Sequence, residues 1–214
     1  MRKGLTPNIE AIIDNVAQLE CIKPYTLCGG TALAIQIGHR MSEDLDFMMW
    51  RISKTEKPEV DWPNIEKEIE EKVGKIEHRD ILGFDQVAFV VNGVKLSFFV
   101  SNNFSPLNER IHYQGNIYIS DVPAILAMKM EVMLRRMKYR DYYDIYSIVK
   151  AGYSLKEGME AALKYSRHKL STKSLMIMLS SNRIPIDANF AQMNPIYDVS
   201  VENMREYMVQ HLNE

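Results

Sequence analysis

Two stretches decide the fold of this chain: residues 25–33 read Tyr-Thr-Leu-Cys-Gly-Gly-Thr-Ala-Leu, and residues 38–47 read Gly-His-Arg-Met-Ser-Glu-Asp-Leu-Asp-Phe. The first stretch predicts a short buried strand that ends at two glycines and is followed directly by a helix. The second leads into a predicted strand over residues 44–50, because the character of the side chains alternates there. Strands and a helix in such close succession indicate an α/β domain.

The glycine pair predicts a phosphate-binding turn. Gly29 and Gly30 have no Cβ atom, so the backbone can come close to a ligand there. The N–H groups at the start of the following helix can hold phosphate oxygens, and the hydroxyls of Thr31 and Ser42 can add to such a site. Taken alone, a strand–Gly-Gly–helix connection is more often a plain tight turn.

Asp44 and Asp46 form a predicted carboxylate pair. They are two residues apart on a predicted strand, so their side chains point to the same face. Carboxylate oxygens on one face suit Mg²⁺ that bridges triphosphate oxygens, and two like charges side by side are costly unless a cation is nearby. We therefore expect both aspartates to be metal ligands, although an isolated Asp-x-Asp often occurs by chance.

The remaining pattern changes character at about residue 120. Before it, helices alternate with strands, and Asn92-Gly93 predicts a hairpin between strands 86–91 and 94–100. After it, only helical patterns follow, near residues 120–138, 140–150, 154 onward, 171–180 and 201–212. The predicted fold class is α/β (α+β), with a mixed sheet and flanking helices over residues 1–119 and a helical bundle over residues 120–214.

Composition narrows the class of protein. The chain has 214 residues, a formal net charge of −2, 46% hydrophobic and 25% charged residues, which is typical of a globular protein with a real core. Its two cysteines, Cys21 and Cys28, do not form a disulfide framework or a metal cluster. No leader-like pattern follows Met1 and no apolar run is long enough to span a membrane, so we expect a cytoplasmic protein.

A second cluster of charged residues lies in the helical half. Residues 128–140 contain five basic side chains against one acid, and on a continuous helix Lys129, Arg136 and Arg140 would share one face suited to phosphate. Asp141 and Asp144, three apart, also share a face. The alternative for each set is structural: a solvated helix face for the cations, and salt bridges for the acids.

These motifs together resemble one protein family. An apolar residue and Gly-Gly, then thirteen residues, then Asp-Leu-Asp-Phe is similar to the signature of the nucleotidyltransferases typified by DNA polymerase beta. The finer pattern, Gly-Gly-Thr-Ala-Leu with Gly-His-Arg-x-Ser-x-Asp-Leu-Asp-Phe, resembles the AbiEii/AbiGii-type nucleotidyltransferase toxins. The stretch from Ala127 through Arg136 to Tyr146 resembles the later motifs of that branch, so the resemblance reaches about residue 150.

The resemblance implies a function and roles for the residues. It implies transfer of a nucleotide from an NTP to an acceptor, with Mg²⁺ or Mn²⁺ as the metal, and a nucleotidyltransferase-like fold for the first domain. Lys129 would contact the triphosphate, Asp144 would be a catalytic or orienting acid, and Arg136 would support nucleotide binding. The acceptor would be the 3′ end of tRNA, another RNA or a protein hydroxyl, and the setting a toxin with a cognate antitoxin protein.

One position departs from the pattern of the wider superfamily. Many of its members carry a third carboxylate on a later strand, and Ser97 stands where that acid is expected. Either Asp144 or Asp85 substitutes for it, or the site holds only the nucleotide-bound metal, or the protein binds nucleotide or a partner without efficient transfer. The alternatives to RNA modification are thus adenylylation of a protein or small molecule, and a degenerate nucleotide- or partner-binding module.

Overall fold

The structure is a computed structural model that describes residues 2–51, 53, 55–56, 58–101, 108–167 and 170–212. The chain forms two compact units, one of residues 1–35 and 41–121 and the other of residues 36–40 and 122–214. The second unit therefore includes a short segment from the N-terminal half, which no sequence pattern indicated. The assignment of residues 1–119 and 120–214 as separate domains stays a prediction.

The first unit is built on a seven-stranded mixed sheet with the strand order β3-β4-β5-β2-β1-β7-β6. The strands are β1 (Thr26–Cys28), β2 (Asp44–Trp50), β3 (Ile76–Gly83), β4 (Gln86–Val91), β5 (Val94–Ser101), β6 (Ile111–Gln114) and β7 (Ile117–Ile119). Strand β2 lies near the centre, antiparallel to β1 and parallel to β5. The sequence predicted four of these strands, β1, β2, β4 and β5, but not β3 or β6, and it left residues 117–119, which form β7, open as a strand or a linker.

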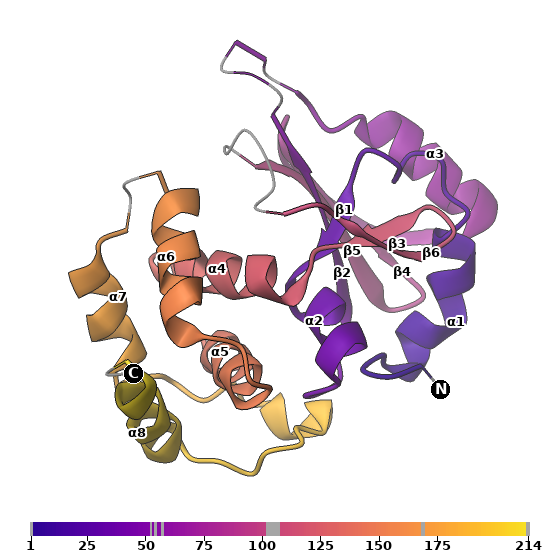
Figure 1. The fold of residues 1–214 in the computed structure, drawn as a ribbon. Coiled ribbons are helices and arrows are strands. Elements are labelled where there is room, and N and C mark those ends of the chain that lie inside the picture. Colours follow the sequence, from indigo (N-terminus) through magenta and orange to yellow (C-terminus); the bar gives the residue numbers. More distant parts are fainter. Residues whose placement is uncertain are drawn as a thin grey trace. The chain divides into compact units, whose positions relative to one another are not determined.

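Three helices belong to this part of the chain: α1 (Pro7–Val16), α2 (Gly29–Ile37) and α3 (Trp62–Lys72). Helices α1 and α3 lie on the same side of the sheet in Figure 1 and contact each other. Each begins with a proline in its first turn, where no helical N–H is lost. Helix α3 buries Ile65 and Ile69 and exposes most of its charged residues.

Apolar side chains of the central strands form the core of the first unit. Phe98 of β5 stacks on Phe47 of β2 with ring centroids 5.2 Å apart, and it meets Tyr25 and Phe89 edge to face. Leu45, like these rings, is fully or almost fully buried. Because side chains alternate along a strand, the residues between them on β2 point to the other face of the sheet.

The second unit is helical. Its helices are α4 (Val122–Met133), α5 (Tyr139–Lys150), α6 (Leu155–Tyr165), α7 (Thr172–Leu179), the 3₁₀ helix η1 (Phe190–Met193) and α8 (Val201–His211). Helix α4 contacts both α5 and α6, and ten of its twelve residues are buried. A helix that is apolar nearly all round must be surrounded, so α4 is the central helix of this unit. The predicted fold class is confirmed, with mixed α/β structure followed by helices.

One predicted helix is wrong in its length. The helical pattern was expected to run to about Lys138, but α4 ends at Met133 and α5 begins at Tyr139. The expectation that Lys129, Arg136 and Arg140 share a face rested on a continuous helix, so it is wrong as well. The connection turns at Leu134 and Arg135 and lets α5 pack back against α4, a tertiary contact that local periodicity does not encode.

Helix α6 packs closely against helix α4 at Gly158. A Cβ atom added there would lie 2.4 Å from Cδ2 and 2.8 Å from Cγ of Leu126 on α4. We predict that Gly158→Ala lowers the free energy of unfolding by about 1–2 kcal/mol, because overpacking outweighs the gain in helix propensity. Urea denaturation measures this. Lys156→Ala, at an exposed position of the same helix, is the control, and an equal or higher stability of Gly158→Ala would contradict the close contact.

Candidate functional site

Asp44 and Asp46 lie on one face of the central strand β2. Both are partly exposed, whereas Leu45 and Phe47 between and beside them are buried on the opposite face. Strand β5 pairs with β2 along its whole length, and β1 pairs with residues 46–48 on the other side, so the backbone that carries the aspartates is held in the sheet. The two carboxylates are therefore presented to the same side on a rigid support.

The glycine turn lies directly beside Asp46. Gly29 has a φ of +70°, in the left-handed region that side chains disfavour, and a Cβ atom there would lie 3.0 Å from Oδ2 of Asp46. Strand β1 ends at Cys28, whose Cα is in register with that of Asp46. Glycine at position 29 thus permits both the sharp turn into α2 and the approach of the helix N-terminus to the carboxylate.

Thr31 and Ser42 are buried and are bonded to each other. The Thr31 hydroxyl lies 2.8 Å from Oγ of Ser42, and it also hydrogen-bonds the backbone carbonyl of Asp44. The Ser42 N–H donates to the carbonyl of Gly4 at 3.0 Å. These contacts tie the first turn of α2 to the start of β2, and a role of either hydroxyl in holding phosphate stays a prediction.

Strand β5 supplies the neighbours of the aspartates. Ser97 is in register with Asp46, and Lys95 is in register with Asp44. Ser97 is buried and neutral, so it adds no negative charge beside Asp46. Lys95 is exposed and was missed by the sequence analysis, although the alternation along its strand places it on the same face as Ser97.

The aspartate pair fits a magnesium ion that also binds substrate. Among the residues that the structure describes, no three His, Cys, Asp or Glu side chains gather closely enough to hold a metal ion by themselves. Mg²⁺ is commonly bound by one or two carboxylates together with phosphate oxygens and water, and two carboxylates on one face provide that many. The donor set therefore suits a metal that arrives with a triphosphate.

Asp144 of α5 is the centre of a buried ion cluster in the second unit. Arg40 donates to it twice, from Nε to Oδ1 at 2.7 Å and from Nη2 to Oδ2 at 2.9 Å. Lys129 Nζ lies 2.7 Å from its Oδ2, and His39 Nε2 lies 2.7 Å from its Oδ1. Burial would raise the pKa of the Asp144 carboxyl, but Arg40, Lys129 and His39 hold it well below its usual range.

Lys129 of α4 bridges the two acids of α5. Its Nζ is 2.7 Å from Oδ1 of Asp141, and Arg136 Nε is 3.2 Å from Oδ2 of the same carboxylate. Burial alone would lower the pKa of Lys129, but the attraction of Asp144 and Asp141 outweighs it and raises that pKa. Three cations, Arg40, Lys129 and Arg136, thus surround two carboxylates, so the cluster carries an excess of positive charge.

His39 is neutral in this cluster. Burial lowers its pKa from the ordinary value of 6.5, and this outweighs the opposing attraction of Asp144. A neutral ring bonded to a carboxylate carries its proton on Nε2, which donates to Asp144. Its Nδ1 is buried and has no hydrogen-bond partner among the described residues.

The predicted charged residues of the helical half are thus divided between two places. Lys129, Arg136, Asp141 and Asp144 come together, but Arg140 instead pairs with Asp187 at 3.0 Å. The sequence analysis missed Arg40 as the bidentate partner of Asp144. Arg40 and Asp144 both lie in motifs that the sequence analysis had identified, and an arginine commonly pairs with a carboxylate. However, 104 residues separate them in the chain, so no local pattern indicates this pairing.

The chain resembles known proteins over most of its length. The family model described as "Nucleotidyl transferase AbiEii toxin, Type IV TA system" matches residues 16–206. A protein of Aquifex aeolicus (strain VF5), aq_aa25, is 32% identical over 158 residues, which is 73% of each chain.

Two crystal structures from Helicobacter pylori share the fold. An H. pylori protein assigned as a nucleotidyltransferase has a TM-score of 0.52 at 19% identity, covering 96% of this chain and 93% of its own. JHP933 has a TM-score of 0.51 at 17% identity, covering 96% of this chain and 90% of its own. At this identity, the likeness concerns the fold alone.

The pKa of His39 predicts a pH dependence of stability. Below about pH 6.5 the unfolded chain binds a proton at His39 that the folded protein does not bind, so stability falls as the pH falls. His39→Gln keeps a donor toward Asp144 but does not titrate. We expect its unfolding free energy to depend less on pH than that of the wild type between about pH 7.5 and about pH 5.5. His78→Gln, at an exposed position, should keep the wild-type slope, and equal slopes for all three proteins would contradict a neutral His39.

Removing the central carboxylate should destabilise the protein strongly. Asp144→Asn leaves Arg40 and Lys129 buried with one anion fewer, which is expected to lower the free energy of unfolding by about 3–5 kcal/mol. Arg136→Gln removes a half-exposed charge from the same cluster and should cost less than about 1 kcal/mol. Denaturant titration of both variants measures the difference, and similar small losses would mean that the cluster is not a stabilising unit.

Proposed function

This chain belongs to the nucleotidyl transferase AbiEii toxin family of type IV toxin–antitoxin systems, and we propose that it transfers a nucleotide from an NTP to an RNA or protein acceptor with Mg²⁺ held by Asp44 and Asp46. The observation that carries the proposal is the partly exposed aspartate pair on one face of β2, with the Cβ-free Gly29 turn against Asp46. A turn without a Cβ atom beside two carboxylates on one face supports the binding of phosphate oxygens together with a metal ion.

Each residue of this site has a proposed task. Asp44 and Asp46 bind the metal ion that accompanies the triphosphate; bound there, Mg²⁺, or Mn²⁺ in its place, would neutralise charge on the phosphates. The N–H groups of the Gly29-Gly30-Thr31 turn hold phosphate oxygens at the N-terminus of α2. The hydroxyl of Ser42 hydrogen-bonds the hydroxyl of Thr31, and this bond holds the first turn of α2 beside the start of β2.

The cluster around Asp144 has a separate proposed task. Lys129, whose ammonium is itself buried between Asp141 and Asp144, would stabilise the triphosphate as pyrophosphate leaves through the excess positive charge of the cluster, with the half-exposed Arg136 in support. Both oxygens of Asp144 already accept from cationic side chains or His39, and the side chain is fully buried. We therefore assign it the orienting role, holding Lys129 and Arg40, in preference to that of a substitute metal ligand for the missing acid at Ser97.

The biological setting follows from the family. We propose that the protein is a cytoplasmic toxin that has a cognate antitoxin protein and modifies the 3′ end of tRNA or another RNA, with a protein hydroxyl as the other candidate acceptor. None of the helices in the described residues is both long enough and apolar enough to cross a membrane. The net charge of −2 leaves RNA binding to local basic residues, so binding of an RNA acceptor should weaken steeply with added salt.

The test is metal-dependent label transfer. Purified protein is incubated with Mg²⁺ and each of α-labelled ATP, CTP, GTP and UTP, with total tRNA or total protein as acceptor. Asp46→Asn should reduce transfer by about 100-fold or more, because loss of a metal ligand removes several kcal/mol of charge stabilisation. Glu43→Gln, an exposed neighbour in the same segment, is the matched control and should keep wild-type activity.

The outcomes separate the candidates. Label on tRNA that is lost in Asp46→Asn supports the RNA-modifying toxin. Label on protein alone would show that the acceptor is a protein hydroxyl and not RNA. Ser97, which stands beside Asp46 without a charge, favours one alternative: a degenerate nucleotide- or partner-binding module. Binding of NTP with no transfer to either acceptor would establish that alternative and reject the proposed enzyme.

A further inference from the structure

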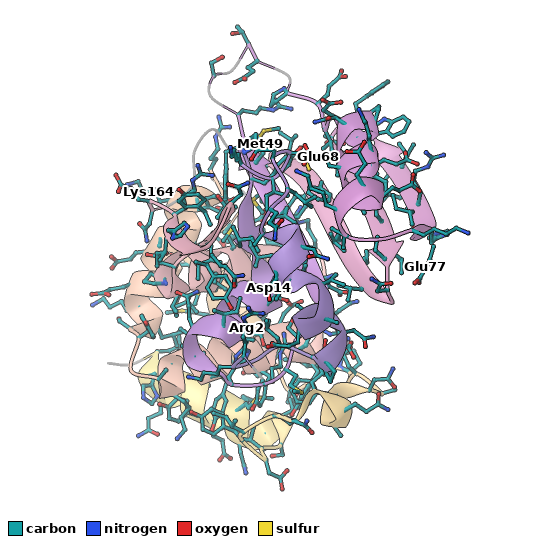
Figure 2. The ribbon with its side chains drawn as sticks, turned by 90° about the vertical axis from the view of Figure 1, so that its right-hand side faces the viewer. Arg2, Asp14, Met49, Glu68, Glu77 and Lys164 are labelled. Atoms are coloured by element: carbon teal, nitrogen blue, oxygen red, sulfur yellow. The ribbon has the colours of Figure 1, made fainter. Side chains whose placement is uncertain are left out.

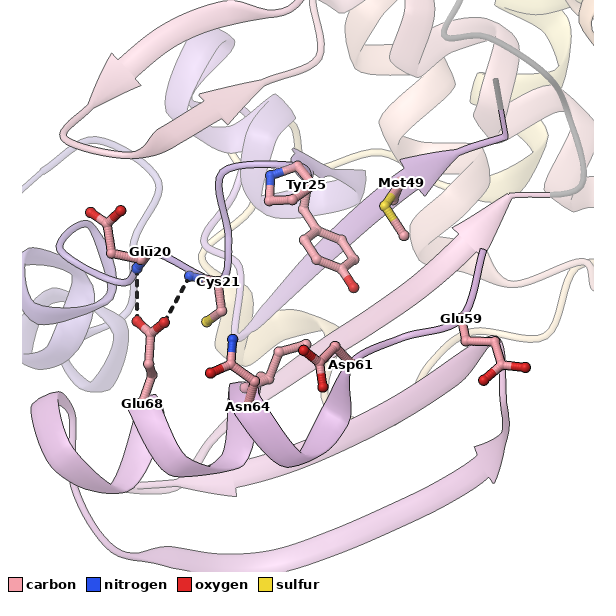
Figure 3. A pocket seen from close by; sticks show the side chains of 10 residues that line it. Glu20, Cys21, Tyr25, Met49, Glu59, Asp61, Asn64 and Glu68 are labelled. Carbon is pink, nitrogen blue, oxygen red and sulfur yellow. Dashed lines mark hydrogen bonds between the residues drawn. The ribbon is translucent and has the colours of Figure 1, made fainter. Parts of the chain in front are cut away.

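A pocket lies on the face of the sheet opposite to the aspartate pair. Its volume is about 390 Å³, and it is bordered by β2, by the segment before β1 and by the start of α3. Met49 of β2 lines it and alternates with the residues that share the face of Asp46, which places the pocket on the other side. Figure 2 marks Met49 and Glu68 of α3, which both line the pocket, and Figure 3 shows them at its opposite ends, with Tyr25 and Asp61 between them.

Most of the polar side chains that line the pocket are carboxylates, which accept hydrogen bonds and attract a cation. Four carboxylates contribute, those of Glu20, Glu59, Asp61 and Glu68, and the lining contains no lysine or arginine. Glu20 is paired with Lys23, and Glu68 accepts from the N–H groups of Glu20 and Cys21 at 2.7 and 3.1 Å. Asp61 and Glu59 have no ion pair within the described ranges, and the carboxylate of Glu59 points away from the others in Figure 3.

Tyr25 provides an independent indication of a ligand. Only 4% of Tyr25 is exposed, and its hydroxyl, which makes no hydrogen bond within the part of the chain that the structure describes, is open to the pocket and not fully enclosed. In Figure 3 this hydroxyl points into the space between Asp61 and Met49. Burial raises the pKa of Tyr25, and the nearby Asp61 adds to this, so the phenol is protonated and can both donate and accept. A hydroxyl at the end of a buried side chain that opens into a pocket is placed to hydrogen-bond a water or a ligand group there.

The chemistry of the lining selects the class of ligand. No three metal-ligating side chains gather among the described residues, so a metal ion is not favoured here. An ammonium group donates three hydrogen bonds and accepts none, which matches the Asp61 carboxylate and the Tyr25 hydroxyl as acceptors. Ile65, Pro24 and Met49 supply apolar contacts for an alkyl stem. We propose that this pocket binds a primary alkylammonium group, from a free polyamine or from the lysine side chain of a partner protein.

Cys21 makes the proposal measurable without an activity assay. It lines the pocket and is a free, partly exposed thiol, whereas Cys28, the other cysteine of the chain, is buried. Burial, and then the charge of Glu68, raises the pKa of Cys21 to about 12, so its alkylation is slow and easily followed. An occupied pocket should protect Cys21 from iodoacetamide, which peptide mass spectrometry can quantify with Cys28 as the internal reference.

The experiment compares n-pentylamine with n-pentanol on the full chain. Pentylamine should slow alkylation of Cys21, and pentanol, which has the same stem without the charge, should not. Asp61→Asn should raise the half-protecting amine concentration about tenfold and Tyr25→Phe about fivefold, since hydrogen bonds to a charged group are lost. Glu70→Gln, an exposed carboxylate of α3 outside the pocket, should stay within about twofold of the wild type.

Two further probes identify the source of the ammonium group. Protection by spermidine at a lower concentration than by Nα-acetyl-lysine methylamide would assign the site to free polyamines, and the reverse order to a lysine of a partner. Equal protection by pentylamine and pentanol, or unchanged protection in Asp61→Asn, would overturn the proposal. All these readings are independent of nucleotide transfer, so failure of the proposed function would leave them unaffected.

Discussion

The buried carboxylate of Asp144 is the interaction on which the helical unit depends. It accepts from His39 and Arg40, which are neighbours in the chain, and from Lys129 of α4. A buried charge of this kind is tolerated only when its partners saturate it, and the cations in turn need the carboxylate to remain in the interior. The segment 36–40 belongs to the helical unit, although it begins in the last turn of α2, the rest of which belongs to the first unit.

The central strand β2 imposes the corresponding constraint on the first unit. Leu45 and Phe47 are buried on one face, where Phe47 stacks on Phe98, and the alternation of the strand therefore places Asp44 and Asp46 on the other face. A shift of one residue in its pairing would bury the aspartates and expose Leu45 and Phe47, so the register is strongly specified. The hydrophobic core and the presentation of the carboxylates are thus two consequences of the same alternation.

The two motifs of residues 25–50 meet different physical demands. Gly29 allows the helix to start against Asp46, and Thr31 with Ser42 ties the turn to the strand. Arg40, only four residues before Asp44 in the chain, is instead saturated by Asp144. One short segment therefore supplies side chains to a partly exposed carboxylate pair and to a buried ion cluster, and a substitution within it can affect stability, chemistry or both.

Much of this could be predicted from the sequence, because the governing forces are local. Alternation in residues 44–50 determined the strand and the shared face of its aspartates, and Asn92-Gly93 determined the hairpin between β4 and β5. Local pattern failed for the edge strand β3, which is exposed on both faces and has no alternation to detect, and for the break after Met133. Only the tertiary structure decided that Arg40 and His39 pair with Asp144 and that the Tyr25 hydroxyl faces a pocket. Such pairings depend on burial and on contacts between distant segments, whose energies no local pattern carries.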